Sequence, residues 1–123
     1  MRILATRYFS RWAKADGLNN KKIVSAVMEL QSGLHDGNLG GNVYKKRVGV
    51  AGRGKRDSVR TIIAFRISSN VFCLYGYPKN ERDNIDKDEL AGFKKVAAFY
   101  LGLSDGQIDG LIKKGELVEV SHA

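Results

Sequence analysis

Apolar residues at helical spacing open the chain and predict two helices. The first set precedes Gly17, a residue type that commonly ends helices, and consists of Tyr8, Trp12 and Ala15. The second set follows Asn19 and Asn20, either of which suits a helix cap, and its stripe fits core packing. That stripe consists of Ile23, Val27, Leu30 and Leu34. The segment 35–42, HDGNLGGN, then predicts a flexible connection because it mixes glycine with small polar residues.

β-branched and aromatic runs replace the helical pattern beyond residue 43 and predict three strands. The runs are the segment around Val48 and Val50, RTIIAFRI at 60–67 and VFCLYGY at 71–77. The connection SSN between the last two runs favours an antiparallel hairpin, because a parallel crossover needs about a dozen residues or more. Pro78 has no N–H for a strand ladder and is expected to end the last strand. RIL at 2–4 allows a further small strand in front.

Two capping patterns predict the helices of the C-terminal part. Asp86 with Glu89 resembles a capping box, and Ser104 with Gln107 repeats the pattern before a shorter helix that Gly115 is expected to end. Helices, then strands, then helices indicate an α+β protein. We expect a small, twisted antiparallel sheet with the N-terminal helices packed on one face and the C-terminal helices following the sheet.

The composition adds a concentrated positive charge to this picture. The 123 residues suit a single domain, 1–123, with 43% hydrophobic residues, and the formal net charge is +8. Between residues 45 and 66 eight basic residues face Asp57 alone, a local balance of +7. The eight are Lys45, Lys46, Arg47, Arg53, Lys55, Arg56, Arg60 and Arg66. Such a field attracts polyanions, so nucleic acid is the expected partner; a solvated charged face is the alternative.

The cysteine and histidine positions bear on compartment and cofactors. Cys73 is the only cysteine, so the chain forms no internal disulfide, and a reducing compartment fits. Arg7 and Arg11 interrupt the N-terminal segment before any apolar stretch long enough for a signal peptide or a membrane span. We therefore expect a cytoplasmic protein without membrane contact. His35 and His122 have no metal-ligand spacing, so neither a metal nor another cofactor is expected.

Cations on neighbouring strands are the groups that cleavage of RNA without a metal would require. Such a reaction needs a base for the 2′-hydroxyl proton, an acid for the leaving 5′-oxygen and fixed positive charge at the phosphate. Alternation places Lys45 and Arg47 on one strand face. Arg60 opens the next strand, from which we expect it to reach the same cleft. Lysine serves as a base only when neighbouring cations and burial lower its pKa, whereas arginine stays protonated and suits phosphate binding.

Other side chains are candidates for holding RNA. The basic, glycine-rich segment 51–58, AGRGKRDS, is expected to form a mobile phosphate-contacting loop, with a plain exposed hairpin as the alternative. Tyr77 shares a strand face with Tyr75 and either stacks on a base or packs in the core. The candidates for RNA contact are Lys46, Arg53, Lys55, Arg56, Arg66 and Tyr77.

Five segments, FSRWAKADGL at 9–18, LGGNVYKKRV at 39–48, AGRGKRDSVRTIIAFR at 51–66, YGYPKNERDNI at 75–85 and DELAGFKKVAAFYL at 88–101, carry a family resemblance in their order and spacing. Together they resemble the RelE-like toxins of toxin-antitoxin operons, especially the HigB-like branch. The resemblance implies a small ribonuclease fold in which helices cover one side of a twisted antiparallel sheet. The open side is then expected to receive messenger RNA in the ribosomal A site.

The resemblance also implies site residues. In such toxins a basic pair on one strand and an arginine opening the next strand carry catalysis, and the matching positions are Lys45, Arg47 and Arg60. A further basic residue near the end of the last strand supplies acid or phosphate contact, and Lys79 and Arg82 flank that position. The tyrosine that the best-known members place shortly afterwards is missing here, where the chain reads DNID. Lys45 is thus the leading base candidate, and the acid is unassigned.

The same kinship implies partners and leaves alternatives. We expect a cognate antitoxin with a helix-turn-helix DNA-binding character, together with messenger RNA and the ribosome. One alternative is a ParE-like toxin, which shares the fold and inhibits DNA gyrase without cutting RNA. The other is a non-enzymatic nucleic-acid-binding module, for which the basic patch alone would suffice.

Overall fold

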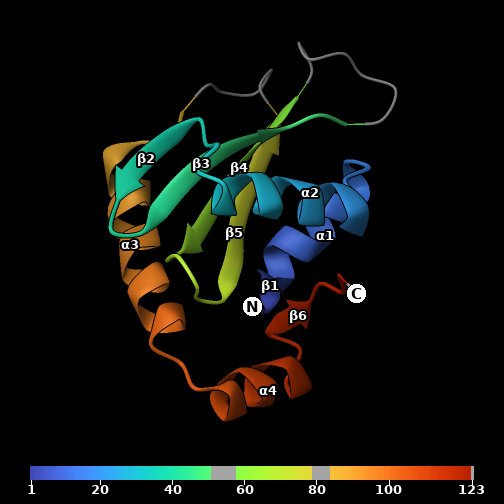
Figure 1. Ribbon diagram of the computed structural model, residues 1–123, viewed down its shortest axis with the longest axis vertical. Helices are drawn as coiled ribbons and strands as arrows, with labels where there is room; N and C mark the ends of the chain where they lie inside the picture. The colour runs from blue at the N-terminus through green and yellow to red at the C-terminus, as the bar shows by residue number, and fades with distance from the viewer. Residues whose placement is uncertain (51–57, 79–83, 123) are drawn as a thin grey trace.

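The computed structural model describes residues 1–50, 58–78 and 84–122, and shows helices on both sides of a sheet (Figure 1). Its elements in chain order are β1 (Ile3–Thr6), α1 (Arg7–Ala15), α2 (Asn20–Gln31), β2 (Gly37–Gly40), β3 (Val43–Val48), β4 (Val59–Phe65), β5 (Val71–Pro78), α3 (Lys87–Leu101), α4 (Asp105–Lys113) and β6 (Leu117–Glu119). Within the described residues the strands form one sheet of order β2-β3-β4-β5-β1-β6. The expected α+β class is confirmed.

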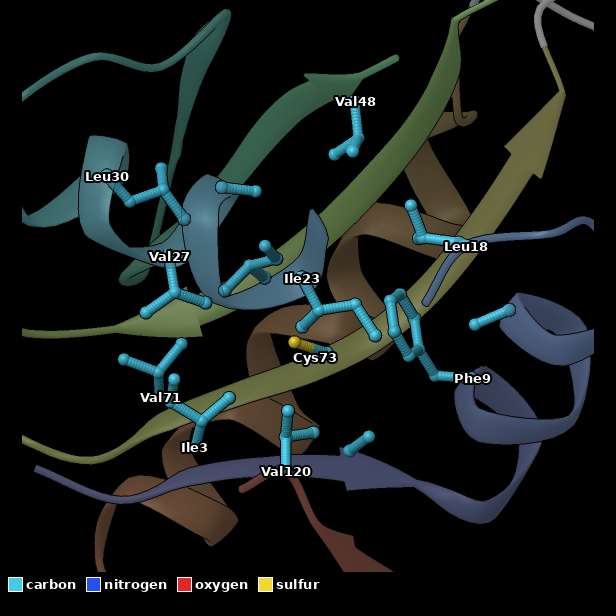
Figure 2. Close-up of a cluster of buried hydrophobic side chains, with 14 of the residues drawn as sticks. Ile3, Phe9, Leu18, Ile23, Val27, Leu30, Val48, Val71, Cys73 and Val120 are labelled. Carbon is cyan, nitrogen blue, oxygen red and sulfur yellow. The ribbon is translucent and has the colours of Figure 1, made fainter. Parts of the chain in front are cut away.

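The helix α1 and the helix α2 pack on one face of the sheet and enclose the larger apolar core (Figure 2). Side chains from both helices meet side chains of β1, β3 and β5 there, and the labelled members of the cluster are Ile3, Phe9, Leu18, Ile23, Val27, Leu30, Val48, Val71, Cys73 and Val120. Burial raises the pKa of the Cys73 thiol to about 12, so the thiol stays protonated near neutral pH.

The opposite face of the sheet is covered as well, which corrects the expectation of an open side. Leu4, Ile62 and Phe72 point to that face and are buried against α3 and α4. Phe72, for example, stacks on Tyr100 of α3 with ring centroids 5.1 Å apart. Every residue of β4 is buried, as in strands covered on both faces. The resemblance implied helices on one side of the sheet only. The second face is covered too because its side chains are apolar.

Most local predictions are confirmed at the element boundaries. The hairpin between β4 and β5 is antiparallel, β5 ends at Pro78, and α3 and α4 both begin with complete capping boxes. Asn19 is the N-cap of α2, its side chain accepting the Lys22 backbone N–H at 2.9 Å. Leu34 lies beyond the end of α2 and is 57% exposed, so its assignment to the apolar stripe was wrong.

Three features of the sheet depart from the expected small antiparallel sheet. The segment predicted to be a flexible connection contains β2, an edge strand paired with β3; backbone ladders need no apolar side chains, so the pattern did not reveal it. β1 runs parallel to β5, and β6 adds an unpredicted antiparallel partner to β1. These pairings join the two ends of the chain, which local patterns do not report.

An ion cluster around Arg2 fastens α4 and β6 to β1. The Arg2 guanidinium lies 2.9 Å from Glu119, 2.7 Å from Asp109 and 3.3 Å from Asp105, measured between the nearest nitrogen and oxygen atoms. The hydrogen bond from Arg2 holds the pKa of Glu119 below its usual value, against the opposing effect of burial. The helix α4 and the strand β6 are thus fixed by charge as well as by apolar packing.

None of the described helices has the length and apolar character needed to cross a bilayer.

Gly76 in β5 allows the indole ring of Trp12 in α1 to lie directly on the strand. A Cβ atom at this position would overlap the six-membered ring of Trp12. We expect Gly76→Ala to lower the free energy of unfolding by about 1–3 kcal/mol, the usual cost of overpacking, in urea denaturation followed by tryptophan fluorescence.

Gly110→Ala is the matched control, since a Cβ there meets no atom within 4 Å and alanine favours the helix α4 by up to about 1 kcal/mol. Equal stability of Gly76→Ala and the parent protein would contradict the role given to the glycine.

Candidate functional site

The register between β3 and β4 brings three cations together on the face that carries α3. Arg47 and Arg60 are direct cross-strand partners, and Lys45 lies opposite Ile62, two residues further along each strand. Because alternate residues share a face, Lys45, Arg47, Arg60 and Ile62 all project to the same side. The strand alternation had predicted this arrangement. Tyr77 of β5 pairs with Arg60, so Arg47, Arg60 and Tyr77 form a row across three strands.

Arg60 is a buried cation that forms hydrogen bonds only with neutral groups among the residues that the structure describes. The residue is only 7% exposed. Its Nη1 atom donates to Ser58 Oγ at 3.0 Å and to the Ser58 carbonyl oxygen at 3.4 Å. Among residues 1–50, 58–78 and 84–122, no carboxylate lies within ion-pair distance of it. Like charges placed opposite each other destabilise a sheet, and an unpaired buried charge is costly. The Arg47–Arg60 pair is therefore suited to an anion bound from outside.

Arg47 is exposed and is held by Asp36, just before β2. The Asp36 carboxylate accepts the Arg47 backbone N–H at 2.6 Å and Nε at 3.3 Å. Partial burial raises the pKa of Asp36, but these two hydrogen bonds outweigh it and the pKa lies below its ordinary value. The contact through Nε orients the guanidinium, and within the described part of the chain no hydrogen bond to Nη1 or Nη2 competes with a ligand.

Lys45 is half-buried, and its amine is held by a residue just ahead of α3. Nζ donates to Asn84 Oδ1 at 2.8 Å. Asn84 belongs to the DNID segment, two residues before Asp86, the N-cap of α3. The contact joins the middle of β3 to the start of the helix that covers this face. The positive groups of the site thus rest on two rigid strands and are oriented by Asp36, Ser58 and Asn84.

Comparison with known protein families places the chain in one of them. The model of the family described as RelE toxin of the RelE/RelB toxin-antitoxin system matches residues 1–120. The chain belongs to the RelE toxin family. Membership implies a cognate antitoxin, and toxins of this family are generally ribonucleases. A search of curated proteins found no match to the chain.

Not all the cations predicted for this RelE-family toxin reach the site. Lys46 projects to the opposite face, is 7% exposed and pairs with Glu29 of α2, with Nζ 3.6 Å from Oε2. Arg66 lies beyond the other end of β4, six residues and roughly 20 Å from Arg60, and donates from Nη2 to the Leu101 carbonyl oxygen at 3.0 Å. Lys46 therefore secures α2, and Arg66 binds the C-terminal end of α3, where a cation is favourable.

Tyr77 and the loop candidates complete the comparison with the sequence predictions. Tyr77 is 2% exposed and its ring lies 6.0 Å from that of Tyr75, so the core-packing alternative describes its position. Five further candidates lie outside the described residues: Arg53, Lys55, Arg56, Lys79 and Arg82.

Sequence reasoning missed the residues that orient the cations of this toxin. Asp36 and Asn84 are 11 and 39 positions away from the residues they hold, and no spacing rule connects them. The signal available for Asp36 was its place before a glycine at the start of the 37–40 segment, where a turn carboxylate often accepts a backbone N–H. Asn84 gave no signal of its own.

Proposed function

We propose that this RelE-family toxin is a metal-independent endoribonuclease that cleaves messenger RNA and so inhibits translation and growth. The observation that carries the proposal is the cross-strand pair Arg47 and Arg60 on one sheet face, of which Arg60 is buried and has no carboxylate partner among the described residues. A phosphodiester supplies the missing negative charge. Arginine binds phosphate through two parallel hydrogen bonds and keeps its charge at every working pH.

The proposed reaction is attack of the ribose 2′-oxygen on the adjacent phosphorus. The new bond from the 2′-oxygen to phosphorus forms as the bond to the 5′-oxygen breaks, leaving a 2′,3′-cyclic phosphate and a free 5′-hydroxyl. Lys45 takes the 2′-hydroxyl proton, and Arg47 with Arg60 stabilises the charge that develops on the phosphate oxygens. Lys79 or Arg82 is proposed to contact the leaving side, and Arg53, Lys55 and Arg56 to contact flanking phosphates. The group that protonates the 5′-oxygen is left unassigned.

The proposed setting is the cytoplasm, with message presented on the ribosome and a cognate antitoxin of the helix-turn-helix type as the inhibitor. Ribosome dependence fits a site that offers charge and positioning, because a second particle can orient the 2′-hydroxyl of a bound message. The branch of the family that these features favour is the HigB-like one, on the residues that carry the sequence resemblance.

The test is to add purified toxin to a translating extract and to map the 5′ ends of the message by primer extension. Discrete new ends that depend on the toxin are expected, and naked RNA at the same toxin concentration should give fewer. An unchanged message together with inhibited DNA gyrase supercoiling would favour the ParE-like alternative. An unchanged message with RNA gel shifts alone would favour a non-enzymatic binding module.

A further inference from the structure

A hollow of about 130 Å³ lies between α2 and the end of β3, on the side of the sheet that α2 covers. This space is called the α2 hollow below. Its polar lining consists of Lys22, Ser25, Glu29 and Arg47. A water molecule occupies about 30 Å³ in the liquid, so the hollow admits a group several times larger. The site described above does not use Lys22, Ser25 or the hollow itself.

The charges around the α2 hollow favour an anion. Lys22, Lys46 and Arg47 bring three positive charges, and Glu29 and Asp36 bring two negative ones that are already paired. The Glu29 carboxylate binds Lys46, and the Asp36 carboxylate binds Arg47. Among the residues that the structure describes, Lys22 has no carboxylate within ion-pair distance. An anion that enters the hollow would meet the amine of Lys22 and the hydroxyl of Ser25.

Arg47 joins the α2 hollow to the catalytic face. It is the cross-strand partner of Arg60 and also lines the hollow. β2 pairs with β3 only as far as Lys45, and Asp36 binds the backbone N–H of Arg47 at the strand edge beyond it. An RNA strand bound at Arg60 and Arg47 would pass round this edge of the sheet to reach α2.

We infer that the α2 hollow is a second phosphate subsite, which binds a phosphodiester of single-stranded RNA further along the strand from the linkage held by Arg47 and Arg60. The inference rests on the proposed function, since it takes its direction from an RNA strand at that pair. Lys22 supplies the charge, Ser25 donates a hydrogen bond, and Glu29 keeps Lys46 turned inward. The subsite fixes the position of the strand and reads no base.

The test is binding of a 2′-O-methyl oligoribonucleotide, which has no 2′-hydroxyl and cannot be cut, over a range of salt concentrations. Lys22→Ala is expected to weaken binding about tenfold at low salt, the effect of losing one hydrogen bond to a charged group. The slope of log affinity against log salt should fall by about 0.7, the value for one phosphate of a single strand. Lys22→Arg should retain most of the affinity, because it keeps the charge.

Lys21→Ala is the matched control, because Lys21 is the exposed neighbour on α2 and does not line the hollow; its affinity and slope should equal those of the parent. Parental affinity and slope in Lys22→Ala would overturn the inference. Weakened antitoxin binding by Lys22→Ala, with RNA binding unchanged, would overturn it in favour of a protein carboxylate. Because the oligonucleotide is uncleavable, these results are independent of message cleavage by the parent toxin, which decides the proposed function separately.

Discussion

Lys45→Arg is expected to reduce message cleavage by about 10²–10⁴-fold, although the variant keeps the positive charge and a donor for Asn84. The reason is chemical: a general base must lose its proton before it can accept one, and arginine stays protonated in proteins. A positioned general base contributes about 10²–10⁴-fold. The measurement is the single-turnover rate of cleavage of a defined message on ribosomes, at toxin in excess.

A second lysine-to-arginine replacement separates the loss of a base from the general effect of the larger side chain. Lys21→Arg is the control, since it makes the same replacement on an exposed helical surface. A Lys45→Arg toxin that cleaves as fast as the parent would show that charge alone is needed and that the base is another group.

Arg60→Met is the second substitution for which we expect a large effect. Its activity should fall while its stability does not. Arg60 is 7% exposed and is hydrogen-bonded within the described residues only to Ser58. Replacing a buried charge with an apolar side chain of similar length removes its desolvation cost, so the free energy of unfolding should stay equal or rise by about 1 kcal/mol or more. Cleavage should fall by about 10²–10³-fold, the usual result of removing one preorganised donor.

Arg47→Met provides the comparison that isolates burial. Arg47 is exposed, so its replacement should reduce cleavage without a comparable gain in stability. Urea denaturation of the parent and both variants, beside the cleavage assay, gives the two quantities needed. A strongly destabilised Arg60→Met protein would show that the arginine is structural and would remove the main support for the site.

The expected stability of Arg60→Met follows from where the two arginines lie in the sheet. Two like charges in cross-strand positions, one of them buried, lower the stability of a sheet. Natural proteins keep such arrangements mainly where a ligand or a reaction requires them. Arg60 therefore stands out in a sheet whose other buried positions are almost all apolar.

The sequence by itself determined the elements whose signals are local. Capping side chains lie within one turn of the helix they start, so Asp86 and Ser104 marked α3 and α4 correctly. The two-residue period of a strand placed Lys45 and Arg47 on one face without any knowledge of the partner strand. The concentration of cations in 45–66 and the family resemblance also needed only the order of residues.

Only the tertiary structure decided which cations meet and what surrounds them. Charge and strand membership did not separate Arg60 from Arg66, which lie at opposite ends of β4, or reveal that Lys46 is covered by α2. The parallel β1–β5 pairing and the cover of both sheet faces likewise depend on contacts between distant parts of the chain. Such contacts are selected by the joint burial of both faces and by closure of the whole chain. No short window of residues contains that information.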